Sequence, residues 1–208
     1  MAAFAVATSC YHWAEVTTSW GAPGRRRMQF DNVVAVFASS DDRLRIAMEN
    51  RIVAEFPRGT PSYRALAAID LGDAAAVRAV FDDDQFDAAI IMTVVLADPR
   101  PTSLLAADLP RSRHPLPART IREQWDRLWN PPFDPASVPP KRLVAIEVQV
   151  YSLRDDHLVW AGRGDPGDAK AIAKLGDAAV ANLSRELARE GILAYALPPH
   201  QDGFRVAE

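Results

Sequence analysis

Residues able to act as nucleophiles or metal ligands are few and scattered in this chain. Cys10 is the single cysteine, and the four histidines (His12, His114, His157 and His200) show no metal-ligand spacing such as H-E-x-x-H. A cysteine–histidine nucleophile would need an unusually placed loop to bring Cys10 to a histidine, and the sequence has no G-x-S-x-G elbow to activate a serine. The sequence therefore predicts no catalytic residue.

A second candidate for chemistry is an acidic cluster made of Asp82, Asp83, Asp84 and Asp87. A calcium loop would also need a glycine and a distal glutamate at fixed spacings, and neither is present in the right place. A solvated turn between a helix and a strand explains the same residues. We interpret the cluster as such a turn and predict no metal site.

The third candidate is G-R-G-D-P-G at residues 162–167, which formally matches the dinucleotide fingerprint G-x-G-x-x-G. That fingerprint belongs to a unit in which a strand, a turn and a helix lead to a parallel strand. The strand that leads into residues 162–167 is instead predicted to be the second arm of an antiparallel hairpin. Asp165 would also lie where a pyrophosphate must approach. Asp41 and Asp42 similarly place negative charge at another helix start. We therefore predict no nucleotide and no other cofactor.

The element around which we expect the rest of the chain to be organised is a hairpin over residues 143–163. Branched apolar side chains alternate with polar ones from Val144 to Val150, which is typical of a strand with one face on a core. Glu147 and Gln149 would then face water. Arg154-Asp155-Asp156 supplies the turn, and Leu158 begins the return strand.

The remaining elements follow from periodicity. Apolar runs predict strands at 33–37, 60–66, 86–96 and 192–197. Residues at helical spacing predict three main helices, the first capped by Ser39 or Ser40 and ended by Pro57, the second capped by Asp73, and the third capped by Asp168 and followed by Gly191. Their buried stripes are, in order, Leu44, Met48, Ile52 and Phe56; Val77, Val80 and Phe81; and Ile172, Leu175, Ala179, Leu183 and Leu187.

Residues 98–141 differ from the rest, because ten of the 16 prolines lie there and exclude regular sheet. The first half is basic, and Ile121, Trp125 and Leu128 predict one short amphipathic helix. We interpret the segment as a proline-stiffened excursion. A flap that binds a partner or a lipid headgroup is the alternative.

Composition favours a globular protein, with 49% hydrophobic and 25% charged residues in 208. The net charge of −3 argues against nucleic-acid binding, and no apolar run approaches the ~20 residues that span a bilayer. We predict an α/β fold leaning to α+β: one mixed sheet of five to six strands, a C-terminal antiparallel hairpin and three main helices. Residues 30–197 would form the single domain, between an anchor region and tether at 1–29 and a tail at 198–208.

Residues 2–9 are small or apolar and lead directly into Cys10. They look like the end of a secretory signal before a processed site, although the basic region and longer apolar core of a complete signal are missing. Either the sequence begins within such a signal, or a frayed N-terminus happens to contain a cysteine.

Several stretches together resemble an uncharacterised family of small bacterial cell-envelope lipoproteins. They are A-T-S-C at 7–10, T-T-S-W at 17–20 with Pro23, F-D-N-V-V-A-V at 30–36, 43–56 with Glu49 in mid-helix, P-S-Y at 61–63, F-D-A at 86–88, and 144–160 with its V-x-V-Y-S-L-x-x-x-x-L-V-W ending. The resemblance covers most of the chain and carries no catalytic signature. It implies an exported α/β domain similar to those of curli-secretion and TolB-type envelope proteins.

By this resemblance Cys10 would carry a lipid after cleavage between Ser9 and Cys10, with residues 11–29 as a tether. Acyl chains contribute ~0.8 kcal/mol per buried CH₂, so several would hold the domain at a membrane. The expected role is binding or envelope assembly without catalysis, facing the periplasm, with an unknown envelope protein or ligand as partner. The alternatives are a small-molecule binder or enzyme using residues 98–141, and a cytosolic scaffold protein.

Overall fold

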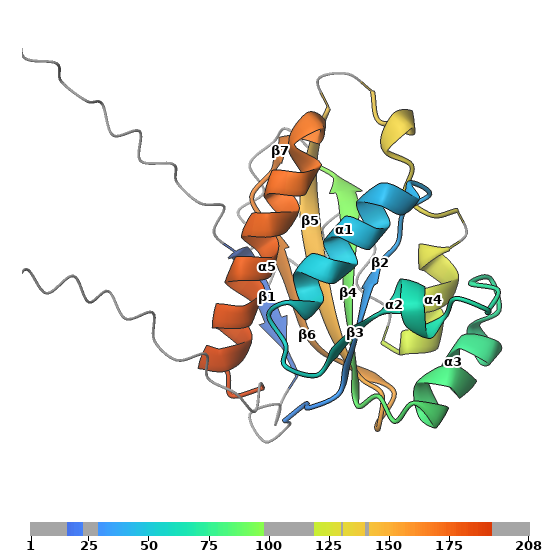
Figure 1. Ribbon diagram of the computed structural model, residues 1–208. Helices are drawn as coiled ribbons and strands as arrows, with labels where there is room; N and C mark the ends of the chain where they lie inside the picture. Colours follow the sequence, from blue (N-terminus) through green and yellow to red (C-terminus); the bar gives the residue numbers. More distant parts are fainter. Residues whose placement is uncertain (1–15, 23–28, 98–118, 130, 140–141, 193–208) are drawn as a thin grey trace, which may run out of the picture.

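The computed structural model describes residues 16–22, 29–97, 119–129, 131–139 and 142–192 of the chain (Figure 1). These residues form one mixed sheet with helices on both sides, which confirms the predicted α/β fold. The sheet contains seven strands within the described ranges, in the order β3-β2-β4-β5-β6-β1, with the short β7 beside the start of β5. In chain order the strands are Val16–Gly21, Val33–Phe37, Gly59–Pro61, Ala88–Leu96, Leu143–Ser152, His157–Gly164 and Gly167–Asp168.

The two halves of the sheet differ in strand direction. β2 runs parallel to β3 and to β4, and helical crossovers connect them. β4, β5, β6 and β1 are antiparallel, and the predicted hairpin forms β5 and β6. The helices are α1 (Asp42–Val53), α2 (Ser62–Ala65), α3 (Ala74–Asp83), α4 (Ile121–Leu128) and α5 (Ile172–Arg189), with 3₁₀ turns at Pro135–Ser137 and Ala169–Ala171.

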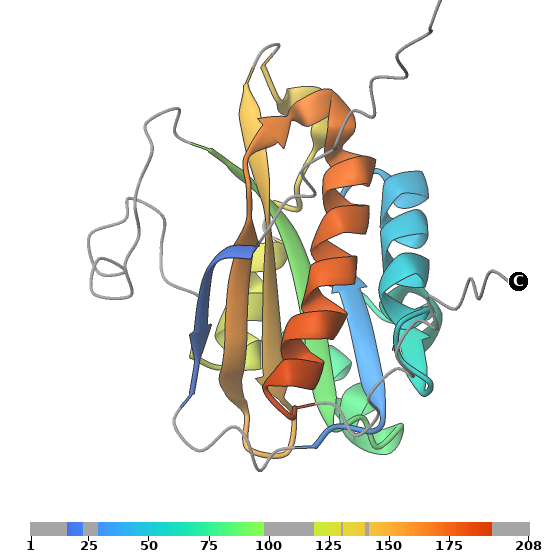
Figure 2. The ribbon, with the colours of Figure 1, turned by 90° about the vertical axis from the view of Figure 1, so that its left-hand side faces the viewer.

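Each face of the sheet has its own core. Figure 2 shows α1 and α5 on one side of the sheet, where Met48, Ile52 and Leu183 pack on alternate residues of β2, β4 and β5. α3 and α4 cover the other face, where Phe81 and Trp125 pack on the intervening residues of the same strands. Burial on both faces explains why β2 and the first half of β4 are continuously apolar.

Part of the predicted tether is a strand of the sheet. Residues 11–29 were expected as an extended lead-in, but β1 pairs antiparallel with β6, from Val16 opposite Gly164 to Gly21 opposite Trp160. β-branched residues at 16–18 favour an extended strand. Pairing also covers backbone groups of β6 that would otherwise form a free edge. The sheet therefore begins before residue 30.

The prediction that Glu147 and Gln149 face water was wrong. Gln149 is 3% exposed, and its neighbour Tyr151 on the same face is fully buried. Glu147 is half-buried and forms an ion pair with Arg163 on β6, with 2.9 Å between Oε1 and Nη2. Alternation of polar and apolar residues identified the strand correctly, but it did not reveal that both faces of β5 are covered.

The ends of α1 and of the segment after it also differ from prediction. Asp41, not Ser39 or Ser40, caps α1, and its Oδ1 accepts hydrogen bonds from the backbone N–H of Arg43 and Leu44. Helix α1 ends at Val53, before Phe56 and Pro57. The strand expected over 60–66 is shorter, because β3 ends at Pro61 and α2 begins at the next residue.

The other helix signals are confirmed. Asp73 caps α3, and α4 forms where the amphipathic spacing predicted it. Asp168 caps the 3₁₀ turn that leads into α5. Gly191 follows α5 with a φ of 70°, and its N–H and that of Ile192 bond back to carbonyls of the last turn, which is a Schellman motif.

The strand expected over 192–197 lies beyond the described residues, apart from the buried Ile192. Within the described part of the chain, no helix has both the length and the apolar character needed to cross a membrane.

Candidate functional site

The lipid-attachment residue predicted from the sequence, Cys10, lies outside the described residues, as do His12, His114 and His200. So do residues 98–118 of the proline-rich segment. Two buried polar networks and one cavity among the described residues remain as candidate sites.

The G-x-G-x-x-G stretch has a packing role. Gly162 and Gly164 belong to β6, which is antiparallel to β5, so no nucleotide-binding crossover is formed. A Cβ atom at Gly162 would lie 2.3 Å from Cη2 of Trp160, because the indole ring lies over the glycine. A Cβ atom at Gly167 would lie 2.7 Å from a methyl group of Leu175 on α5. These two glycines make room for core side chains.

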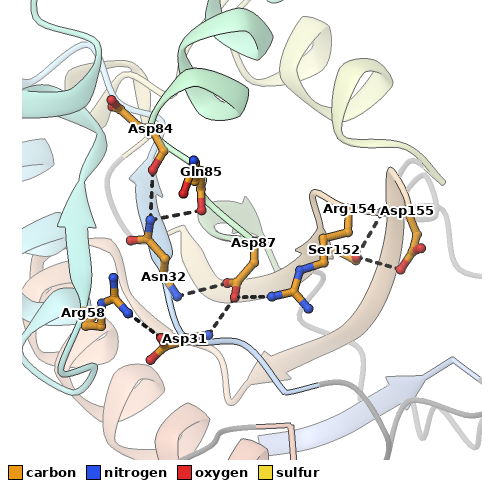
Figure 3. A network of polar contacts seen from close by, with 9 residues as sticks. All are labelled: Asp31, Asn32, Arg58, Asp84, Gln85, Asp87, Ser152, Arg154 and Asp155. Carbon is orange, nitrogen blue, oxygen red and sulfur yellow. Dashed lines mark hydrogen bonds and ion pairs between the residues drawn. The ribbon is translucent and has the colours of Figure 1, made fainter.

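A polar network centred on Asp87 connects the loops at one end of the sheet (Figure 3). The carboxylate of Asp87 is buried and accepts three hydrogen bonds. The backbone N–H of Asp31 donates to Oδ2 at 2.9 Å, that of Asn32 donates to Oδ1 at 3.2 Å, and Nη2 of Arg154 donates to Oδ2 at 2.9 Å. The loop before β2, the start of β4 and the β5–β6 turn are therefore held by one carboxylate.

The surrounding contacts extend this network. The side-chain amide of Asn32 donates to the carbonyls of Asp84 and Gln85, which turns the chain between α3 and β4. Gln85 has a φ of 55°, a conformation that suits a tight turn. Arg58 pairs with Asp31 at 2.6 Å. The network connects loops to one another. The oxygens of the Asp87 carboxylate already accept hydrogen bonds from within the protein.

The four aspartates that are close together in the sequence have different environments in the structure. Asp82, Asp83 and Asp84 are exposed, whereas Asp87 is buried in the network. Asp82 pairs with Arg78 one turn earlier on α3. Within the described residues, no group of three or more His, Cys, Asp or Glu side chains is arranged to hold a metal ion.

A second network surrounds Glu49, whose side chain is completely buried in mid-helix. Oε1 accepts from the backbone N–H of Phe37 at 3.1 Å, Nε of Arg45 at 3.1 Å and Oγ of Ser62 at 2.7 Å. Oε2 accepts from the backbone N–H of Tyr63 at 2.8 Å. The network joins α1 to β2 and to the start of α2, so Glu49 holds the parallel half of the sheet to its helices.

A cavity of about 350 Å³ lies between α3 and α4, beside the β5–β6 turn. Apolar side chains form most of its lining, and Arg78, Arg122 and Asp156 add polar groups; the apolar members are Ala74, Ala75, Val77, Phe81, Ile121 and Trp125. The indole N–H of Trp125 donates to the carbonyl of Leu71 at 2.8 Å, which fixes the ring in the wall. Its volume lies in the range of small-molecule sites. Its four large apolar side chains (Val77, Phe81, Ile121 and Trp125) are themselves only 1–3% exposed.

Arg78 connects this cavity to the β5–β6 turn. Its Nε donates to Asp82, and its Nη2 donates to the carbonyl of Leu153 at 2.6 Å. Its Nη1 lies 3.7 Å from Oδ1 of Asp156, which is beyond hydrogen-bond distance. Both of these atoms are shielded from solvent, and neither has a hydrogen-bond partner among the described residues. The two atoms form an ion pair with each other, although they are too far apart for a hydrogen bond.

Tyr151 lies beneath α4 in the core of the same face and is fully buried. Burial raises the pKa of its hydroxyl above the ordinary value of 10.0, because the phenolate would lose its hydration. Arg127 opposes this rise and Glu123 adds to it. Tyr151 therefore stays protonated in neutral solution and acts as a buried polar group of the core.

The sequence analysis did not identify Arg78, Asp156 or the Glu49 network. Two signals were available: Arg45 and Glu49 are four residues apart beside the apolar stripe of α1, and Arg78 and Asp82 have the same spacing on α3. Such pairs usually lie on a solvated helix face, so only the tertiary structure distinguishes the buried pair from the exposed one.

Comparison with known proteins gives matches among solved structures alone. No protein-family model matches the chain, and no curated protein matches it significantly. Two similar solved structures are PelC dodecamers from Paraburkholderia phytofirmans, one of a point variant and one in a different space group. They are 9% and 11% identical, with TM-scores of 0.40 and 0.38, and cover 84% of this chain and 98% and 97% of those chains. At these values the similarity assigns neither a family nor an activity to this protein.

Proposed function

We propose that this protein is a non-catalytic binding or assembly domain of the cell envelope, held at a membrane by a lipid on Cys10. The proposal starts from the small residues that precede Cys10 and from the resemblance to envelope lipoproteins. Its partner would be an envelope protein or a ligand, and the domain would face the periplasm.

The observation that carries this proposal is the run of small residues directly before Cys10, and the position of β1 determines what such an anchor would hold. This strand begins at Val16, so only residues 11–15 separate Cys10 from the edge of the sheet. Six Cα–Cα steps in an extended chain cover about 20 Å. A lipid on Cys10 would thus hold the β1 edge close to the bilayer surface.

The buried carboxylates support binding over catalysis. Glu49 and Asp87 are the two acidic residues that the described part of the chain buries, and each accepts three or more hydrogen bonds. A general base needs a free lone pair directed at a substrate proton. Both carboxylates instead hold loops and helices together.

Mass spectrometry of the mature N-terminus tests the anchor. The gene would be expressed in a bacterium with its natural upstream sequence, and the membrane fraction would be collected. We expect a mature chain that begins at Cys10, with a mass increase equal to its acyl groups, and a Cys10→Ala control that leaves the membrane. An unmodified Cys10 in a cytosolic chain would contradict the proposal and favour the cytosolic scaffold instead.

Small-molecule binding is a second candidate function, and the cavity between α3 and α4 favours it. One wall of this cavity is α4, which lies within the 98–141 segment that the sequence suggested as a flap. Binding of a small ligand and attachment to a membrane are compatible, so the two functions can coexist in one domain.

A further inference from the structure

We propose that β1 pairs with β1 of a second copy of this chain, antiparallel and across a two-fold axis, so that the sheet of one copy continues into the other. The inference goes beyond the proposed function, and it depends neither on a lipid at Cys10 nor on a ligand in the cavity. Two features lead to it, namely the unprotected backbone of this edge and the symmetry of its outward groups.

The two edges of the sheet differ in how they are protected. Figure 2 shows β1, in blue, as the outermost strand beyond β6, and β3 is the last strand at the other end of the order. β3 has three residues, ends in Pro61 and passes directly into α2. Short strands and prolines at an edge limit pairing with another chain. β1 has six residues, and none of them is charged or a proline.

Alternate residues of β1 direct their backbone groups away from β6. The N–H of Ala22, just after the strand, donates to a carbonyl of β6 at 2.8 Å. Hydrogen-bonded and non-bonded pairs alternate in an antiparallel ladder, so Thr18 and Trp20 also bond to β6. Ser19 and Gly21 therefore direct their N–H and C=O groups outward. The register shift of β1 precedes Thr18, and no strand within the described ranges lies on the outer side.

These outward groups are complementary to a second copy of themselves. In an antiparallel pair centred on Trp20, Ser19 of each copy lies opposite Gly21 of the other. Each such pair exchanges two N–H···O=C hydrogen bonds. A two-fold axis repeats this exchange, so every outward N–H and C=O group of Ser19 and Gly21 gains a partner.

Charge in the sequence around β1 favours this antiparallel arrangement. The nearest charged residues are Glu15 before the strand and Arg25 after it, each five residues from Trp20. An antiparallel pair centred on Trp20 aligns the chain before one strand with the chain after the other, so opposite charges attract at both ends. Like charges do not meet within the pair of strands, because β1 itself carries none.

Hydrogen exchange of single backbone amides, measured by NMR on the full chain at rising protein concentration, tests the proposal. The N–H groups of Thr18 and Trp20 should be protected at every concentration, because they bond to β6. Those of Ser19 and Gly21 should become at least about tenfold more protected as the dimer forms. Analytical ultracentrifugation of the same samples should show a monomer–dimer equilibrium.

Ser19→Pro removes an outward donor and leaves the bonds to β6, and edge strands accept proline where the N–H faces away from the sheet. We expect it to raise the dissociation constant of the dimer at least about tenfold, because each copy loses one of its hydrogen bonds to the other. Ser19→Ala keeps the N–H and is the matched control, with an expected change of less than about twofold. Protection of the Trp20 amide in both variants verifies that β1 still pairs with β6.

The charges beside the strand give a second test that leaves β1 unchanged. Arg25→Glu brings like charges together at both ends of the pair and should weaken dimerisation about threefold or more. Adding Glu15→Arg to this variant reverses both charges and should restore the wild-type dissociation constant within about twofold. A double variant as weak as Arg25→Glu alone would contradict the alignment centred on Trp20.

Three other results would overturn the inference. The chain could remain monomeric at all concentrations. Dimers could form while Ser19 and Gly21 stay unprotected, in which case another surface makes the contact. These two amides could also be protected equally at every concentration, which would mean that a segment of the same chain covers the edge. None of these measurements requires a lipid at Cys10, so this inference and the anchor proposal can fail separately.

Discussion

Two carboxylates lie below the surface of the described structure, and each is held by several donors. Asp87 receives two backbone N–H groups and an arginine, and Glu49 receives two backbone N–H groups, an arginine and a serine. A buried charge is tolerated only when such partners replace its hydration. These residues are therefore expected to contribute to folding, and substitution should affect stability more than any binding property.

Glu49→Gln tests this at the more buried position. The substituted amide would turn N–H groups toward a site built entirely of donors, and the guanidinium of Arg45 would lose its negative partner. We expect the free energy of unfolding to fall by about 3–5 kcal/mol, as when one member of a buried ion pair is removed. Urea unfolding followed by circular dichroism measures this change.

Glu55→Gln is the control for that experiment, because Glu55 lies just after α1 and its half-buried carboxylate has no hydrogen-bond or ion-pair partner among the described residues. The free energy of unfolding of this variant should stay within about 0.5 kcal/mol of the wild-type value. If the two variants had similar stabilities, the Glu49 network would not be holding α1 to the sheet.

The buried hydroxyl of Tyr151 makes stability depend on pH in the alkaline range. The folded state keeps its proton above pH 10, where an unfolded chain with a pKa near 10.0 loses it. The unfolded state then binds fewer protons, so this group's contribution is complete below pH 10 and decreases above it. We expect Tyr151→Phe to reduce the loss of unfolding free energy between pH 10 and pH 11 by about 1 kcal/mol. Identical pH slopes in both proteins would contradict this expectation.

At the scale of elements, local sequence signals located most strands and helices. Alternating branched residues predicted β5, and helical spacing of Ile121, Trp125 and Leu128 predicted α4 even between prolines. The failures have a common cause. Burial of Gln149 and pairing of β1 depend on segments far away in the chain, and periodicity within a short window contains no information about them.

Two glycines in β6 test whether the missing side chain at Gly162 makes room for the ring of Trp160. A Cβ atom at Gly162 would overlap the ring of Trp160, whereas one at Gly164 would meet its nearest atom, the carbonyl oxygen of Ile146, at an ordinary 3.9 Å. Gly162→Ala should therefore lower the free energy of unfolding by about 1–3 kcal/mol, and Gly164→Ala should change it by much less. Thermal unfolding of the two variants measures the difference. A larger loss at Gly164 would show that the indole does not need this space.

At the scale of the whole molecule, one sheet separates two cores, and the cavity lies on the α3–α4 side. Its lining comes from α3, α4 and the β5–β6 turn, which are far apart in the sequence. Arg78, Arg122 and Asp156 share no motif spacing. The fold class was therefore predictable from the sequence, whereas the cavity depends on how three separate segments pack.

The position of β1 gives a prediction for the limits of the domain. A chain lacking residues 1–21 would lose this strand and expose the backbone groups of β6. We expect it to be less stable than the full chain by at least about 2 kcal/mol and to aggregate more readily. A chain lacking only residues 1–14 keeps β1 and should lose less stability. Chemical unfolding and light scattering compare the two, and equal stability would mean that β1 adds nothing to the sheet.

Pairing of β1 with β6 also imposes an order on folding. The first strand to be synthesised needs a partner that follows nearly all the rest of the domain, so a growing chain cannot complete this edge. Contacts between such distant segments form slowly, because a long loop must close before the strand gains its hydrogen bonds. Strand β1 therefore cannot take its place in the sheet until the chain has been synthesised as far as β6.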